Sequence, residues 1–106
     1  MLTKDEFAES FSLTIRGVAK AKNLCIKYLE EDCGISPAYI KRTGKEKFCI
    51  NLYMACVIAD YLDEPLDKLV KLAENKVFVK NPTTGKPELD VDKYMTLKGV
   101  ELNVYN

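Results

Sequence analysis

The most informative absence in this sequence of 106 residues is that of histidine. Histidine is the usual general base near neutral pH and a common zinc ligand, so histidine-based catalysis and mixed Cys/His zinc sites are excluded. The sequence also lacks GxSxG, a phosphate-binding loop and HExxH. No neighbour of a cysteine is recognisable as the activator that a thiol nucleophile needs. We therefore expect no enzyme, no catalytic residue, no cofactor and no bound metal.

Tightly spaced cysteine pairs are absent as well. The four cysteines are Cys25, Cys33, Cys49 and Cys56, and no CxxC pair occurs among them. Structural zinc sites usually draw on such pairs, so a metal centre is not expected here. We predict reduced thiols that pack as small hydrophobic residues inside a helical core.

Long apolar runs are missing too, since none approaches the about 20 residues that span a bilayer. The first residues, Met1 to Glu6, become acidic at once, unlike the basic start of a secretory signal. Hydrophobic residues make up 47% of the sequence and charged residues 30%, which is an ordinary globular composition. We expect a cytoplasmic protein with one packed core and no membrane association.

Charge of one sign is also lacking overall, because 16 basic residues balance 16 acidic ones. The distribution along the chain is uneven. Residues 1–14 carry a net charge of −2, residues 15–48 carry +4 and residues 49–106 carry −2. Only the middle segment is basic, and a nucleic-acid-binding protein needs only one basic face.

The first helix has a well-marked start. Thr3 and Glu6 have the spacing of a capping box, in which each side chain bonds the backbone amide of the other. Apolar residues then recur at helical spacing, which predicts a helix to about Lys22. A second, shorter helix is predicted over residues 25–33, with Leu29 and Cys33 facing inward.

The junction before the third helix carries two strong signals. Gly34 suits the left-handed residue that ends a helix. Ser36 and Pro37 then suit the N-cap and the first helical position. The third helix is predicted to run from Pro37 to about Thr43, with Gly44 ending it.

Two further helices complete the predicted domain. Asn51 caps the fourth, and its inward stripe is predicted to contain Leu52, Ala55, Cys56, Ala59 and Leu62. Pro65 opens the fifth, whose apolar face consists of Leu66, Leu69, Val70 and Ala73. The prediction is an all-α domain of five helices over residues 3–75.

The remaining residues, 76–106, have a different composition and hydrophobic pattern. Residues 77–79 are β-like, 81–87 are rich in turn residues and 100–104 alternate as a strand does. Residues 90–95 suit one helical turn. Short strands need a sheet partner, so we predict that this extension is a dimerisation arm; the alternative is a hairpin folded back on its own domain.

Several of these segments share the order and spacing of a known family. They are Ile15-Arg16, Leu24, Leu29, the run Gly34 to Arg42 and the run Ile58 to Leu69. Together, residues 15–70 resemble the Cro/C1 repressor type of helix-turn-helix domain, also called the XRE family. The resemblance implies a lambda-repressor-like fold and a sequence-specific regulator of double-stranded DNA, a repressor of phage or mobile-element type. It also implies a homodimer on half-sites about one DNA turn apart.

The third helix of such a domain enters the major groove with its N-terminal residues. The predicted DNA-binding residues are Lys27, Ser36, Ala38, Tyr39, Lys41, Arg42, Lys45 and Lys47. Arg42 either reads a guanine or clamps a phosphate. Lys27, Ser36, Lys45 and Lys47 are predicted phosphate contacts. Tyr39 either stacks on the sugar-phosphate backbone or wedges between helices.

A second function remains open because the sequence departs from the family pattern. Cys25-Ile26 stand where Ser-Gln is usual, Glu30 where a small residue is usual and Thr43 where an apolar one is usual. These departures suit a helix-turn-helix scaffold that binds a protein and modulates another regulator without contacting DNA. A continuous basic surface over residues 41–47 would favour DNA, and acids within it would favour a protein. RNA binding has less support, since no aromatic stacking platform is visible.

Overall fold

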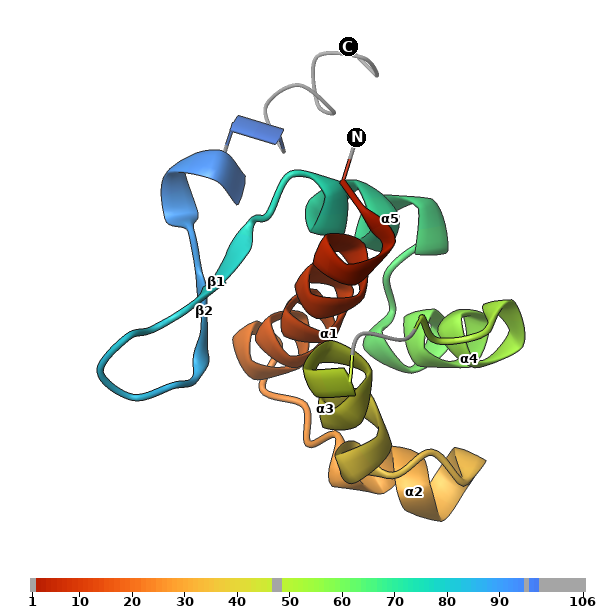
Figure 1. Ribbon diagram of the computed structural model, residues 1–106. Helices are drawn as coiled ribbons and strands as arrows, with labels where there is room; N and C mark the ends of the chain where they lie inside the picture. Colours follow the sequence, from red (N-terminus) through yellow and green to blue (C-terminus); the bar gives the residue numbers. More distant parts are fainter. Residues whose placement is uncertain (1, 47–48, 95, 98–106) are drawn as a thin grey trace, which may run out of the picture.

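The computed structural model describes residues 2–46, 49–94 and 96–97, which form five helices followed by a β-hairpin (Figure 1). The helices are α1 (Lys4–Ala21), α2 (Lys27–Cys33), α3 (Pro37–Glu46), α4 (Leu52–Leu62) and α5 (Leu66–Glu74). The strands are β1 (Phe78–Lys80) and β2 (Pro87–Leu89). The predicted mainly helical fold with β character after the helices is thus confirmed, as is a helical turn at residues 91–94. Within the described ranges, no helix combines the length and the apolar character that crossing a bilayer requires.

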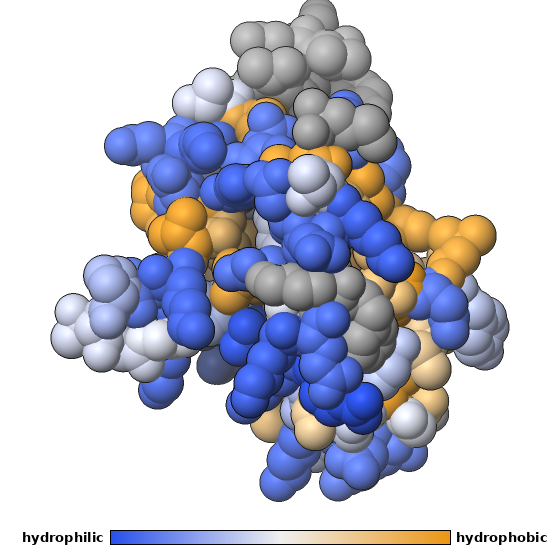
Figure 2. All heavy atoms as spheres, in the orientation of Figure 1, coloured by the Kyte–Doolittle hydropathy of each residue, from blue (hydrophilic) through white to orange (hydrophobic). Residues whose placement is uncertain are grey.

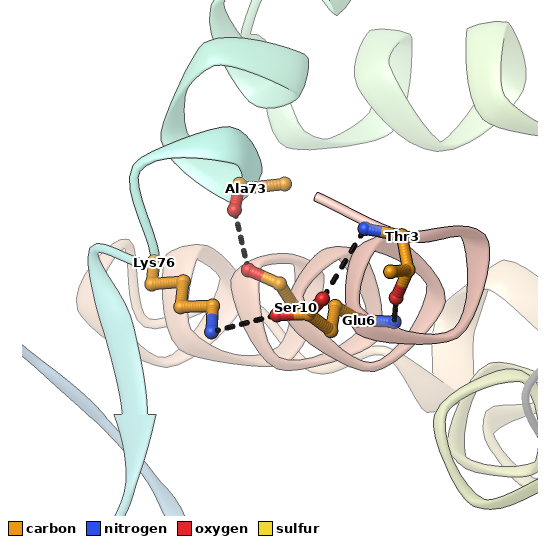
Figure 3. Close-up of polar contacts among 5 residues, drawn as sticks. All are labelled: Thr3, Glu6, Ser10, Ala73 and Lys76. Carbon is orange, nitrogen blue, oxygen red and sulfur yellow. Dashed lines mark hydrogen bonds and ion pairs between the residues drawn. The ribbon is translucent and has the colours of Figure 1, made fainter. Parts of the chain in front are cut away.

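Helix α1 lies in the middle of the fold and packs against α3, α5 and the hairpin. Its predicted capping box is confirmed. The Glu6 amide donates to Thr3 Oγ1 at 3.2 Å, and the Thr3 amide donates to Glu6 Oε1 at 3.3 Å (Figure 3). These bonds satisfy amides that the first turn of a helix leaves unpaired.

Three buried hydroxyl groups on α1 donate hydrogen bonds to backbone carbonyls. Ser10 donates to the carbonyl of Ala73 at the end of α5 (Figure 3). Ser12 Oγ donates to the carbonyl of Ile40 in α3 at 2.8 Å. Thr14 donates within α1 itself. Because a buried hydroxyl without a partner is costly, the bonds of Ser10 and Ser12 also fix where α5 and α3 sit on α1.

The junction between α2 and α3 follows the predicted signals. Gly34 adopts a left-handed conformation with φ 73°, and its amide donates to the Glu30 carbonyl at 3.1 Å. The Tyr39 amide donates to Ser36 Oγ at 3.1 Å, so Ser36 caps α3. Helix α2 begins at Lys27 and not at Cys25 as predicted, because the residues before it form only a turn.

The predicted end of the third helix at Gly44 is wrong, since α3 continues to Glu46. Gly44 is buried against α1. A Cβ added there would lie 3.0 Å from Ser12 Cβ, closer than ordinary side-chain contacts allow. The glycine is therefore explained by the close approach of two helices and not by a helix stop.

The prediction that the cysteines pack in the core is also wrong. Cys25, Cys33, Cys49 and Cys56 are all exposed free thiols. The buried stripe of α4 consists of Ala55, Ile58, Ala59 and Leu62. Leu52, predicted to face inward, precedes this stripe at the helix start and is 73% exposed.

The hairpin closes on the helical domain. β1 and β2 pair antiparallel, with Phe78 opposite Leu89 and Lys80 opposite Pro87. The Phe78 ring lies so close to α1 that a Cβ added at Gly17 would overlap it. This agrees with the predicted alternative, in which the extension folds back on its own domain as a hairpin. The strand that pairs with β1 consists of residues 87–89. The strand expected at 100–104 lies outside the described residues, and dimerisation stays a prediction.

Candidate nucleic-acid interface

Helix α3 has an inner face and an outer face of different chemistry. The inner face buries Ile40, Thr43 and Gly44 against α1. Ala38, Lys41, Arg42 and Lys45 are exposed. Figure 2 shows mostly hydrophilic residues, in blue, on the face that carries α3. Four of the predicted contact residues on α3 are therefore accessible to a ligand.

Two other predicted contacts, one that caps this helix and one on it, have structural roles. Ser36 is half-buried, and its hydroxyl oxygen already accepts the Tyr39 amide. Tyr39 is half-buried as well and packs against the hydrophobic core. Of the two roles predicted for Tyr39, the packing agrees with a wedge between helices.

Arg42 is paired with an acid on its own helix. Its Nε and Nη2 atoms donate to the two carboxylate oxygens of Glu46, each at 3.3 Å. Both side chains are exposed, at 59% and 51%. An exposed pair four residues apart on a helix stabilises by only about 0.3–0.5 kcal/mol. A phosphate or a guanine can therefore take the guanidinium from Glu46 at little cost.

Lys41 and Lys45 lie on the same outer face of α3, at the edge next to α1 and β1. They are four residues apart, and both line a cleft together with Arg16 of α1 and Lys80 of β1. The predicted cations of α3 thus divide into two groups, Lys41 with Lys45 and Arg42 with Glu46. Sequence reasoning did not select Arg16 or Lys80 because neither lies near α3 along the chain.

The second helix contributes less than predicted. Lys27 is exposed at its first position, but Glu30 and Glu31 are exposed on the same short helix. Glu30, which stands where a small residue is usual in the family that the sequence resembles, is exposed, so its carboxylate carries no burial cost. Lys47 lies outside the described residues.

Thr43 departs from the family pattern without leaving a polar group unpaired. It is 1% exposed, and its hydroxyl donates to the Ile40 carbonyl at 2.7 Å. The side chain therefore fills an apolar site while satisfying its own hydrogen bond.

Among the described residues, no three side chains of His, Cys, Asp or Glu are grouped as metal ligands would be.

Comparison of the chain with protein-family models, with curated proteins and with solved structures found no match. The candidate interface rests on the geometry of α3 and its neighbours.

Proposed function

We propose that the protein binds double-stranded DNA through α3, as a helix-turn-helix regulator of the Cro/C1 type. The observation that carries the proposal is the outer face of α3, where Lys41, Arg42 and Lys45 are exposed beside the small Ala38. A small residue near the start of the helix lets the backbone approach base edges, while the cations bind phosphates.

The turn before α3 supports the same proposal. Helix-turn-helix units join their two helices by a turn of 3–4 residues that often contains glycine. Here residues 34–36 separate α2 from α3, and Gly34 supplies the left-handed conformation. Leu29 and Ile40, one from each helix, are 0% exposed and hold the two helices on the core.

The resemblance to the Cro/C1 type adds the regulatory part of the proposal. The protein acts as a transcriptional repressor, and two copies bind half-sites about one DNA turn apart. Phosphate contacts provide most of the non-specific affinity, so a local basic face suffices in a chain of zero net charge.

The test is a fluorescence-anisotropy titration with random duplex DNA from about 50 to 200 mM salt, where the loss of phosphate contacts is steep. Removing both cations in Lys41→Ala/Arg42→Ala should abolish most of the binding. The matched control is Lys71→Ala/Lys93→Ala, which removes two exposed lysines away from α3. Absence of binding by the folded wild type at the lowest salt would refute the proposal.

A second candidate is a scaffold that binds a protein and modulates another regulator. Two observations favour it: Glu46 pairs with Arg42 within the basic face, and Tyr53 on α4 is 78% exposed beside Leu52. Exposed aromatic residues such as tyrosine are typical anchors of protein interfaces. Failure of the folded wild type to bind duplex DNA would favour this second candidate.

A further inference from the structure

An open cleft of about 510 Å³ is lined by residues of helix α1, helix α3 and strand β1. In Figure 1 the hairpin lies beside α1, so the cleft is formed by elements that are far apart in the sequence. Four basic residues, Arg16, Lys41, Lys45 and Lys80, are among those that line it. Glu9 is the one acid among the residues that line it in the described part of the chain. The surplus of positive charge indicates an anion site.

Arg16 is the most unusual of these cations. Its guanidinium is half-buried, and its Nε atom is buried with no hydrogen-bond partner among the described residues. Burial lowers the pKa of Arg16 below its usual value, yet an arginine remains charged at neutral pH. A desolvated charge with an unpaired donor is costly, and no described residue compensates for it at this atom.

Repulsion between the two lysines of α3 is a second unfavourable interaction at the cleft. Lys41 and Lys45 are four residues apart on one helix face, where like charges destabilise a helix. Gly44 also lines the cleft, where α3 lies closest to α1. An anion in the cleft would offset both the lysine repulsion and the desolvation of Arg16.

We propose that this cleft binds a phosphate group, held by the guanidinium of Arg16 and the ammonium groups of Lys41, Lys45 and Lys80. Phosphate fits better than a carboxylate because it offers more oxygens and up to two negative charges to four cations. The phosphate belongs either to the backbone of duplex DNA or to a free phosphate or nucleotide. Only the first source rests on the proposed function.

The sequence provides a direct probe, because Arg16 and Arg42 are its only arginines. Their two Nε–H signals can be followed by NMR while the whole chain is titrated with inorganic phosphate at constant ionic strength. The Arg16 signal should move to saturation, and the signal of Arg42, which does not line the cleft, should move less. An Arg16 signal that does not respond would overturn the proposal.

Two hairpin variants make the probe specific. Lys80→Ala should weaken phosphate binding about tenfold, the equivalent of one charge-assisted hydrogen bond. Lys86→Ala, an exposed lysine of the same hairpin that does not line the cleft, should leave it unchanged. Glu9→Gln should strengthen binding by removing the opposing charge. Equal affinities for wild type and Lys80→Ala would refute the site.

The same variants separate the two phosphate sources and the two proposals. If Lys80→Ala weakens duplex binding and Lys86→Ala does not, the cleft holds a DNA phosphate and the hairpin extends the α3 interface. If Lys80→Ala affects only inorganic phosphate, the site stands and its ligand is a free phosphate or nucleotide. A wild type that binds no DNA refutes the proposed function, while the Arg16 signal still decides the phosphate site.

Discussion

Helices α1 and α2 lie next to each other in the sequence but are stabilised in opposite ways. α1 has 18 residues, a complete capping box and ten buried residues. α2 has seven residues, and Ile26 before it makes no side-chain capping bond. Isolated helices of this length are unstable in water. α1 therefore carries much of its stability in its own sequence, whereas α2 depends on the domain around it.

The largest effect should come from removing what holds α2. Of the α2 side chains that the structure describes, Leu29 alone is buried, at 0% exposure. Leu29→Ala should lower the free energy of unfolding by about 2–5 kcal/mol, from lost apolar burial and the cavity left behind. Chemical denaturation measures this. The control is Tyr28→Ala on the exposed side of the same helix; an equal loss in both variants would contradict the dependence on Leu29.

An intermediate effect is expected where α1 supports the hairpin. Gly17→Ala places a methyl group into the Phe78 ring and should cost about 1–3 kcal/mol through overpacking. Amide exchange should accelerate in β1 and β2 and remain unchanged in α2. Replacing the ring as well, in Gly17→Ala/Phe78→Leu, should recover part of the loss. No recovery would mean that the glycine is needed for another reason.

The smallest effect concerns the α1 capping box. Hydrogen bonds with the Thr3 side chain and backbone, and then with Lys76, lower the pKa of Glu6 below its usual value of 4.5 (Figure 3). A carboxyl whose folded pKa is depressed stabilises fully above its unfolded pKa, and this is lost as pH falls through the folded value. Glu6→Gln should therefore be less stable than wild type near neutral pH and equal to it in strong acid.

Thermal unfolding across this pH range measures the difference. Glu74→Gln provides the control, because it removes an exposed acid at the end of α5, outside the capping box. A difference between Glu6→Gln and wild type that stays constant down to strong acid would show that the capping box does not depend on the charge of Glu6.

The features predicted correctly from the sequence are those with local causes. The caps at Thr3, Ser36 and Asn51 each involve a partner three residues away, so residue type and spacing suffice to find them. The left-handed turn at Gly34 is local as well. These signals placed all five helices to within a few residues.

The features that sequence reasoning missed depend on contacts between distant segments. Gly44 continues its helix because Ser12 of α1 approaches it, and nothing near Gly44 in the sequence indicates this. The pairing of β1 with residues 87–89 and the meeting of Arg16 with Lys80 have the same origin. The exposed outer face of α3 was predictable from its periodicity, and the cleft beside it was not.

The four exposed cysteines also determine how this protein behaves once purified. Accessible thiols are open to oxidation and to disulfide exchange, and each molecule offers four such groups to its neighbours. In air, molecules will become covalently linked through their surfaces, and such adducts imitate a dimer on a sizing column. Because none of the thiols fills the core, serine at all four positions removes this artefact without disturbing the interior. Self-association should accordingly be judged in reductant or in the serine-substituted chain.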